Sequence, residues 1–311
     1  MPSQEISYGG WNNNLRLFNE AVELVVTLEV GPRILSYRPV TTAGDGVNVL
    51  KNYPEQLGGV SEPEWKIRGG HRTWIAPEHE ILSYAWDNVP FPYEFLGDYG
   101  IRATNPGIEP WFLKKETTIE LAPAGSGVTI EHTITNESDD TWEVSPWALT
   151  VMEPGGICIL PQPPLGEHPR DLLPNRLLVA WPYSDLSDPR LSIGRHILTL
   201  EQRAGGVPFK IGLAHQTGYA AYLLGNQLFV KTVPYCSGVK YTDYGCNYES
   251  FTNHEMLEVE TLGPLTELAP GESVSHTEEW RLFSDLNPPA VTDTPEFAEW
   301  LASLLRQGGL P

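Results

Sequence analysis

The sequence predicts an all-β protein built as a large antiparallel β-sandwich with a short C-terminal helix. Segments rich in β-branched and aromatic residues recur from the first 30 residues to about residue 283. The 29 glycines and 28 prolines fall mainly between these segments, where turns require them. Roughly a dozen strands or more with one helix favour two large sheets packed face to face.

The clearest strand pattern is a hairpin. Residues 117–121 and 128–134 alternate apolar and polar side chains, and residues 122–127 between them contain one proline and two glycines. Such alternation is typical of strands with one face in the core and the other in water. Another strand begins at Val22 and stops before Gly31-Pro32. Further strands are expected at 142–152, 177–181, 196–200, 219–224, 228–232, 256–261 and 273–283.

One segment near the C-terminus predicts an α-helix at about residues 294–307. Thr294 can cap this helix, Pro295 suits its first turn, and Gly308 ends it. The apolar residues between these positions share one face, which we expect to dock on the sandwich. They are Phe297, Trp300, Leu301, Leu304 and Leu305. No internal repeat or low-complexity linker is visible, so residues 1–311 are expected to form a single domain.

The charge of the chain limits its partners. With 40 acidic and 20 basic residues, the formal net charge is −20, which repels nucleic acid phosphates and anionic lipids. We therefore expect no nucleic acid or membrane partner. The N-terminal residues lack the pattern of a secretory signal, and no run of apolar residues is long enough to span a membrane. Together with only three cysteines, this favours a cytoplasmic location.

The segment from Ile67 to Glu80, IRGGHRTWIAPEHE, has the densest set of chemically active side chains. Its two glycines allow close backbone approach to a ligand, its arginines offer planar hydrogen-bond donors, and its tryptophan offers an apolar face. This segment provides no clear set of three metal ligands, and we expect no metal and no other cofactor. The candidate site residues from this segment are Arg68, His71, Arg72, Trp74 and Glu78.

Three further segments supply candidate residues. Glu258 and Glu260 lie two apart in a predicted strand and so point the same way. Two carboxylates on one face raise each other's pKa, which is one route to a general base. Trp147 is either a core residue or a platform for a sugar ring. Asp243 belongs to the glycine-punctuated, tyrosine-rich loop 241–249, which suits a ligand with many hydroxyl groups.

Several short motifs follow one another in an order that resembles a known family. They are GPRILSY from Gly31 with VNVL at 47–50, IRGG at 67–70, and ET at 260–261 followed by LAPGES at 268–273. Together they resemble the galactose mutarotase-like superfamily, which includes aldose 1-epimerases and hexose-6-phosphate 1-epimerases. GGHRTWIAPE, PWALTVM and ETLGPL are similar to a branch of that superfamily whose function is unknown. The resemblance implies the supersandwich fold over most of the chain.

The resemblance also implies a proton relay at the anomeric carbon of a sugar. In that chemistry a glutamate takes a proton from the O1 hydroxyl, and a histidine gives one to the ring oxygen. Glu260 matches the glutamate. Ser-Pro-Trp at 145–147 occupies the place of the histidine, and none of these side chains donates a proton as an imidazolium does. His71 or His254 would have to replace it, and we assign the role of acid to His71.

Three functions are consistent with these residues. The first is an aldose 1-epimerase-like enzyme acting on a small sugar or an oligosaccharide, with Glu260 as base and arginines that orient the substrate. The second is a polysaccharide or uronate lyase on the same sandwich, in which Arg72 would neutralise the uronate carboxylate. The third is a carbohydrate-binding domain without catalysis. A monomer and a homodimer are both consistent with the sequence.

Overall fold

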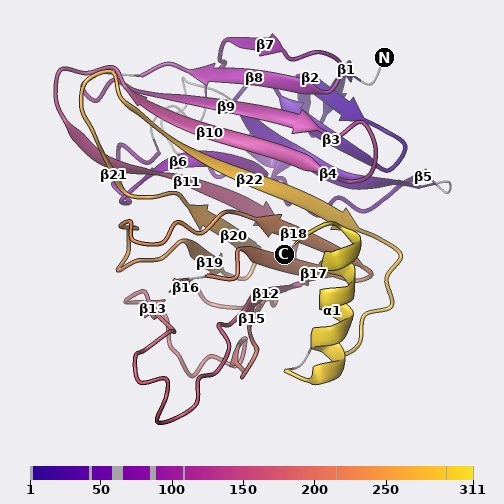
Figure 1. The fold of residues 1–311 in the computed structure, drawn as a ribbon. Coiled ribbons are helices and arrows are strands. Elements are labelled where there is room, and N and C mark those ends of the chain that lie inside the picture. Colours follow the sequence, from indigo (N-terminus) through magenta and orange to yellow (C-terminus); the bar gives the residue numbers. More distant parts are fainter. Residues whose placement is uncertain are drawn as a thin grey trace.

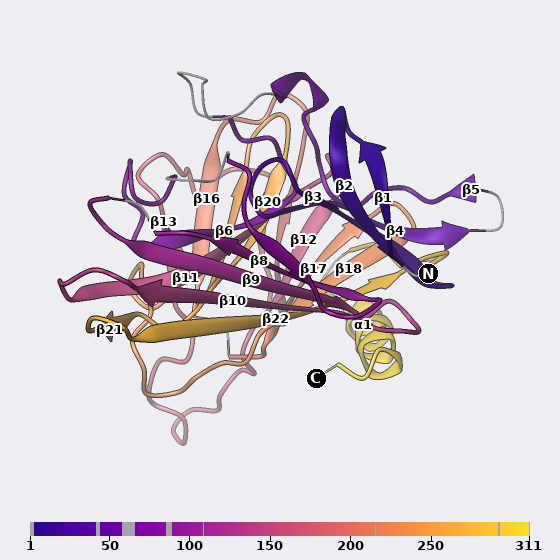
Figure 2. The ribbon, with the colours of Figure 1, turned by 90° about the horizontal axis from the view of Figure 1, so that it is seen from above.

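The computed structural model describes residues 3–41, 44–57, 66–84, 89–107, 109–214, 216–291 and 293–310. Within these residues, two large antiparallel sheets pack face to face, and one α-helix lies against one end of the smaller sheet (Figures 1 and 2). The prediction of an antiparallel β-sandwich with a C-terminal helix is confirmed. None of the described helices is long and apolar enough to cross a lipid bilayer.

The larger sheet brings together strands from both ends of the chain. Its centre is formed by β6, β11 and β20, which are far apart in sequence and pair antiparallel. Short strands β5 (Gly44–Asp45) and β21 (Thr266–Leu268) pair with β4 and β11, and a 3-10 turn, η1, spans Pro54–Gln56. In order, the sheet consists of β1 (Ser3–Tyr8), β2 (Trp11–Phe18), β3 (Val22–Thr27), β4 (Arg33–Thr41), β6 (His71–Ala76), β11 (Trp142–Met152), β20 (Leu257–Leu262), β19 (Tyr248–Thr252), β16 (Phe209–Leu213) and β13 (Leu178–Ala180).

The smaller sheet contains the predicted hairpin. Its two strands, β9 and β10, pair from Val128 opposite Leu121 to Asn136 opposite Leu113, and their buried and exposed residues alternate. In order, the sheet consists of β14 (Leu191–Ile193), β15 (Ile197–Glu201), β12 (Ile157–Pro161), β17 (Tyr219–Leu224), β18 (Gln227–Thr232), β22 (Ser273–Phe283), β10 (Val128–Asn136), β9 (Leu113–Leu121), β8 (Gly100–Asn105) and β7 (Tyr93–Phe95).

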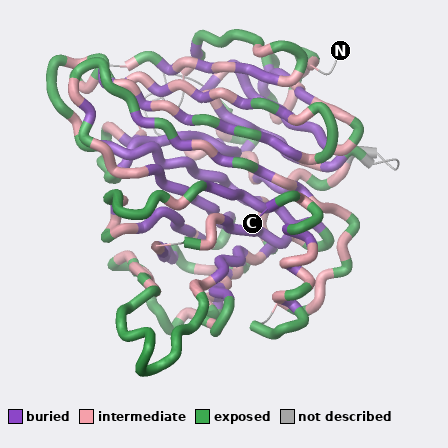
Figure 3. Tube along the Cα trace, viewed as in Figure 1, coloured by how far each residue is buried: buried purple, intermediate pink, exposed green. Residues whose placement is uncertain are grey.

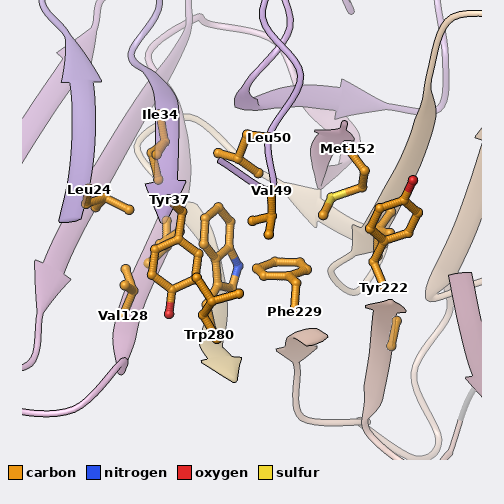
Figure 4. Close-up of a cluster of buried hydrophobic side chains, with 14 of the residues drawn as sticks. Leu24, Ile34, Tyr37, Val49, Leu50, Val128, Met152, Tyr222, Phe229 and Trp280 are labelled. Atoms are coloured by element: carbon orange, nitrogen blue, oxygen red, sulfur yellow. The ribbon is translucent and has the colours of Figure 1, made fainter. Parts of the chain in front are cut away.

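The main hydrophobic core fills the space between the sheets (Figure 4). Trp280 is fully buried there, with its ring centroid 5.1 Å from that of Phe229 and 5.8 Å from that of Tyr37. Removing each such side chain from water stabilises the fold by roughly 1.5–3 kcal/mol. The buried segments in Figure 3 follow the facing strands, whereas the loop at residues 163–175 is mostly exposed.

The C-terminal helix α1 (Pro295–Gln307) forms as its sequence predicts. The Thr294 hydroxyl accepts a hydrogen bond from the backbone N–H of Phe297, and Gly308 follows the last turn. Alternation along β17 places Ala220 and Tyr222 between the sheets and leaves Ala221 on the opposite face. The helix covers this outer face with Phe297, Leu301, Leu304 and Leu305.

Docking of α1 is testable with one truncation. Leu301→Ala removes a buried side chain from the helix interface and leaves a cavity, so we expect a loss of about 2–5 kcal/mol in the free energy of unfolding. Urea unfolding measures the loss. Glu299→Ala, at an exposed position of the same helix, should change stability by no more than about 0.5 kcal/mol. Equal effects from the two variants would show that the helix does not depend on this contact.

Candidate functional site

A pocket of about 240 Å³ lies over the centre of the larger sheet, on the face that points away from the smaller sheet. Side chains of β6, β11, β16, β19 and β20 form its floor, and residues of the four segments before β6, after β6, after β13 and between β19 and β20 form its rim. The residues that line it are Ile67, Arg72, Trp74, Glu78, Tyr84, Trp147, Leu149, Tyr183, Lys210, Phe251, Asn253, Met256 and Glu258.

Strand register explains why these residues meet. Paired residues of antiparallel strands share one face of a sheet. Leu149 lies opposite Arg72 on one side and opposite Glu260 on the other, and Glu260 lies opposite Glu249. One row across the sheet thus carries a guanidinium and two carboxyl groups. In the neighbouring row, Trp74 pairs with Trp147, and these rings lie 5.4 Å apart, edge to face.

Glu260 is fully buried beneath the pocket. Its Oε2 accepts hydrogen bonds from Trp147 Nε1 at 2.8 Å and from Lys210 Nζ at 3.0 Å. Lys210 Nζ also lies 2.7 Å from Glu249 Oε2, and 4.5 and 4.7 Å from the ring centroids of Trp147 and Trp181. One ammonium group is therefore shared by two carboxyl groups. Among the described residues, no group donates a hydrogen bond to Oε1 of Glu260.

Burial and charge set the pKa values of this group. Burial raises the pKa of Glu249 well above its usual range; Lys210 opposes this shift, and the negative charges of Glu260 and Asp243 add to it. Burial alone would lower the pKa of Lys210, but Glu260 and Glu249 together hold it above its usual value. Lys210 therefore stays charged, while Glu249 keeps its proton to higher pH than an ordinary glutamate.

Arg72 and Glu258 form a second ion pair, on the pocket wall. Arg72 Nη2 lies 3.2 Å from Glu258 Oε1, and the guanidinium carbon lies 4.3 Å from the ring centroid of Trp74. Burial raises the pKa of Glu258; Arg72 opposes this effect, and Glu260 adds to it. Since Glu258 lines the pocket, it offers a carboxyl group that can hold a proton next to a ligand.

The rim of the pocket is more exposed than its floor. The Tyr84 hydroxyl donates a hydrogen bond to Glu78 Oε1. The ring of Tyr84 packs edge to face against that of Trp74, with the two ring centroids 4.6 Å apart. Tyr183 follows β13 and is 50% exposed. These rings leave an opening bounded by aromatic side chains, which suits a ligand with an apolar face.

Most of the site residues that the sequence predicted meet at this pocket. Glu260 lies directly under it, bonded to two residues that line it, and on the same face as Glu258, as their spacing predicts. Those in the lining are Arg72, Trp74, Glu78, Trp147 and Glu258. Lys210 and Tyr183 were not predicted from the sequence, and Glu249 ends the predicted loop 241–249 but was not chosen there as a site residue. Lys210 is the one charged residue of the apolar strand β16, so its local sequence does not indicate that it belongs to a site.

Arg68 and Asp243 do not line the pocket. Arg68 is buried in the turn before β6, where its backbone N–H donates to Gln56 Oε1 at 3.0 Å. Asp243 lies in the loop before β19 and affects the site through its charge near Glu249. The glycine pair after Arg68 approaches the chain itself: a Cβ on Gly69 or Gly70 would lie 2.1 or 2.3 Å from a backbone oxygen.

His71 lies on the opposite face of β6 from Arg72, between the two sheets, because successive strand residues alternate. Its Nδ1 lies 2.9 Å from the Thr150 hydroxyl, and its Nε2 lies 3.1 Å from Nε2 of His132. Burial holds the pKa of His71 well below its usual range, although Glu278 opposes the shift. The structure thus does not bring His71 together with Glu260, and His71 is not a candidate acid for this pocket.

Comparison with known proteins supports the fold. No protein-family model and no curated protein matches the sequence. Among solved structures, a galactose mutarotase-like protein from Lactobacillus casei superposes with a TM-score of 0.57 at 12% identity, covering 87% of this chain and 100% of that one. The protein Slr1438 from Synechocystis gives 0.58 at 12% identity, covering 91% and 100%. A galactose mutarotase related enzyme from Lactobacillus acidophilus gives 0.54 at 10%, covering 88% and 98%. This chain therefore has the galactose mutarotase-like fold that its motifs predicted.

The proton on Glu249 gives a test by pH. A carboxyl whose folded-state pKa is raised stabilises the fold below its ordinary pKa of 4.5, and this contribution is lost as pH rises through the folded-state pKa. Glu249→Gln resembles the protonated side chain and does not titrate. We expect the wild-type free energy of unfolding to fall relative to that of this variant as pH rises above the ordinary pKa of 4.5.

Urea unfolding at several pH values measures this difference. Glu267→Gln, at an exposed position of β21, is the matched control and should follow the wild type. The opposite trend, in which the wild type gains on Glu249→Gln as pH rises, would mean that Lys210 holds Glu249 as a carboxylate.

Proposed function

We propose that the pocket binds a small sugar and that the protein is an aldose 1-epimerase-like enzyme. The observation that supports this most directly is the composition of the pocket. Trp74, Trp147 and Tyr183 line it together with the charged groups of Arg72, Lys210 and Glu258. A sugar ring has apolar C–H faces that lie against aromatic rings, and hydroxyl groups that exchange hydrogen bonds with charged side chains.

The size of the pocket favours a small ligand. Pockets for drug-sized molecules occupy roughly 300–1,000 Å³, and this one is about 240 Å³. We therefore propose a single sugar ring, or the terminal ring of an oligosaccharide, as the occupant. The likeness of the fold to a galactose mutarotase related enzyme agrees with this proposal.

Epimerisation at the anomeric carbon needs one group that takes the O1 proton and one that supplies a proton to the ring oxygen. We propose Glu260 as the base, since its Oε2 is held by Lys210 and Trp147 while Oε1 accepts no hydrogen bond from the described residues. Because Glu260 is covered by these two side chains, the sugar must displace one of them to reach it. Glu258, with its raised pKa, is the proposed acid.

A sugar-binding module without catalysis is the second candidate. It is favoured by one observation: none of the described residues that line the pocket is a histidine. Each pocket cation is also already paired, Arg72 with Glu258 and Lys210 with Glu249 and Glu260. Such paired charges can bind hydroxyl groups without moving protons.

Proton NMR of freshly dissolved α-D-glucose, α-D-galactose and glucose 6-phosphate separates the two candidates. If the protein is an epimerase, it will speed the equilibration of the anomeric signals of at least one of these sugars. Glu260→Gln should lower that rate roughly 100-fold or more, because it removes general base catalysis. Glu258→Gln should lower it by a similar factor.

Glu267→Gln, at an exposed position away from the pocket, should keep the full rate. Binding without acceleration, in a well-folded protein, would contradict the epimerase and leave the binding module. Absence of both binding and acceleration for all of these sugars would contradict both proposals.

The aromatic rim gives a test that does not depend on catalysis. Tyr183→Ala removes a half-exposed ring from the pocket, so we expect sugar affinity to fall by roughly 0.5–1.5 kcal/mol, about two- to tenfold in Kd. Calorimetric titration measures the change. Tyr244→Ala is the control, since Tyr244 is 90% exposed and does not line the pocket. Equal affinities for the two variants would place the sugar elsewhere.

A further inference from the structure

A second cluster of chemically active side chains lies between the two sheets, on the opposite face of β6 from the pocket. It contains His71 from the larger sheet, and His132 and Glu278 from β10 and β22 of the smaller sheet (Figure 1). All three side chains are buried. Nothing in the proposed sugar chemistry uses them.

The three inward-facing atoms are arranged as metal ligands are. Nε2 of His71 lies 3.1 Å from Nε2 of His132 and 3.5 Å from Oε2 of Glu278, and the third side of the triangle is 3.9 Å. A circle through points at these separations has a radius of about 2 Å, which matches the length of a zinc–nitrogen or zinc–oxygen bond. An ion at its centre would contact all three atoms without any change in the backbone.

The surroundings of the histidines fix their orientation. Nδ1 of His71 lies 2.9 Å from the Thr150 hydroxyl, and Nδ1 of His132 is bonded to the Thr73 hydroxyl and lies 3.2 Å from that of Thr117. A hydroxyl that accepts from Nδ1–H leaves the lone pair of a neutral imidazole on Nε2. Metal-binding histidines are oriented in this way by a partner on the other ring nitrogen.

Glu278 is held equally firmly. Its Oε1 lies 2.8 Å from Lys231 Nζ and accepts a hydrogen bond from the Thr261 hydroxyl, while Trp280 Nε1 donates to Oε2 at 3.2 Å. The ring of Trp280 is the one that stands at the centre of Figure 4. These three partners come from strands β18, β20 and β22 of the two facing sheets.

We propose that His71, His132 and Glu278 form a binding site for a divalent transition-metal ion of the zinc type, which joins the two sheets. Two imidazoles and a carboxylate are ligands that Zn²⁺ accepts. The gap beside the two histidines has no space for a water molecule, so the ion enters while the sheets are still apart during folding.

The positive charge of Lys231 opposes metal binding at this site. Its ammonium group, bonded to Glu278 and to the Val259 carbonyl at 3.2 Å, repels a second cation, and the metal–ligand bonds must outweigh this repulsion. Lys231→Met removes the repulsion but leaves a buried carboxylate unpaired. We therefore expect Lys231→Met to be destabilised in the absence of metal and to recover its melting temperature when folded with Zn²⁺.

The first experiment uses the full-length wild-type protein produced in zinc-supplemented medium. Elemental analysis after gel filtration should find one equivalent of zinc per chain that brief treatment with a chelator does not remove. Refolding from denaturant with Co²⁺ in place of Zn²⁺ should give the intense visible absorption of a low-coordinate cobalt site. This measurement needs no variant, so it does not depend on whether a variant folds.

Variants then locate the ion. His132→Gln should lose the bound metal, and Thr117→Val should bind it roughly 10- to 100-fold more weakly, because it removes an orienting partner. His196→Gln is the control: His196 is an exposed histidine between β14 and β15 and is not one of the three proposed ligands. It should keep one equivalent. Wild-type protein without stoichiometric metal, and with the same melting temperature after folding with zinc or with chelator, would overturn the proposal.

Discussion

The antiparallel pairing of β6, β11 and β20 is the constraint on which both polar groups of this protein depend. These strands lie side by side at the centre of the larger sheet, and each sends alternate residues to opposite faces. Arg72 and Glu260 therefore reach the pocket, while His71 and Thr261 reach the space between the sheets. A slip of one residue in this register would exchange the two sets and place charged side chains against the hydrophobic core.

Ion pairs on both faces are stabilised by their neighbours rather than by water. Lys210 and Lys231 are each almost fully enclosed; Lys210 contacts two carboxyl groups and Lys231 contacts that of Glu278, and each also lies near an aromatic ring. Removing one partner of such a pair leaves a buried charge and typically costs 3–5 kcal/mol. The carboxyl groups that accompany these lysines are thus part of the fold as well as of the sites. A ligand in the pocket must compete with the ion pairs that already exist there.

Local patterns in the sequence predicted the strands and the helix, whereas the pairing of strands far apart in sequence determines which residues meet at the pocket. The hairpin of β9 and β10, the helix from Pro295 and the common face of Glu258 and Glu260 all follow from periodicity and capping. Successive residues of a strand point to opposite faces of the sheet, so His71 and Arg72 cannot both face the pocket. The prediction that placed both side chains in one site was therefore wrong for a reason visible in the sequence. Lys210 and Glu249 could not be found in this way, because only the order β20-β19-β16 brings their strands beside Glu260.

The absence of an imidazole among the described pocket residues limits which groups could transfer protons here. A histidine titrates near neutral pH without assistance, whereas a carboxyl group does so only when burial and neighbouring negative charge raise its pKa. Glu249 and Glu258 receive such shifts from burial in the sheet and from Glu260. Any acid–base chemistry in this pocket is therefore set by the number of carboxyl groups that share Arg72 and Lys210. In the part of the chain that the structure describes, Glu249, Glu258 and Glu260 form ion pairs with these two cations, so one proton balances the charge of this group.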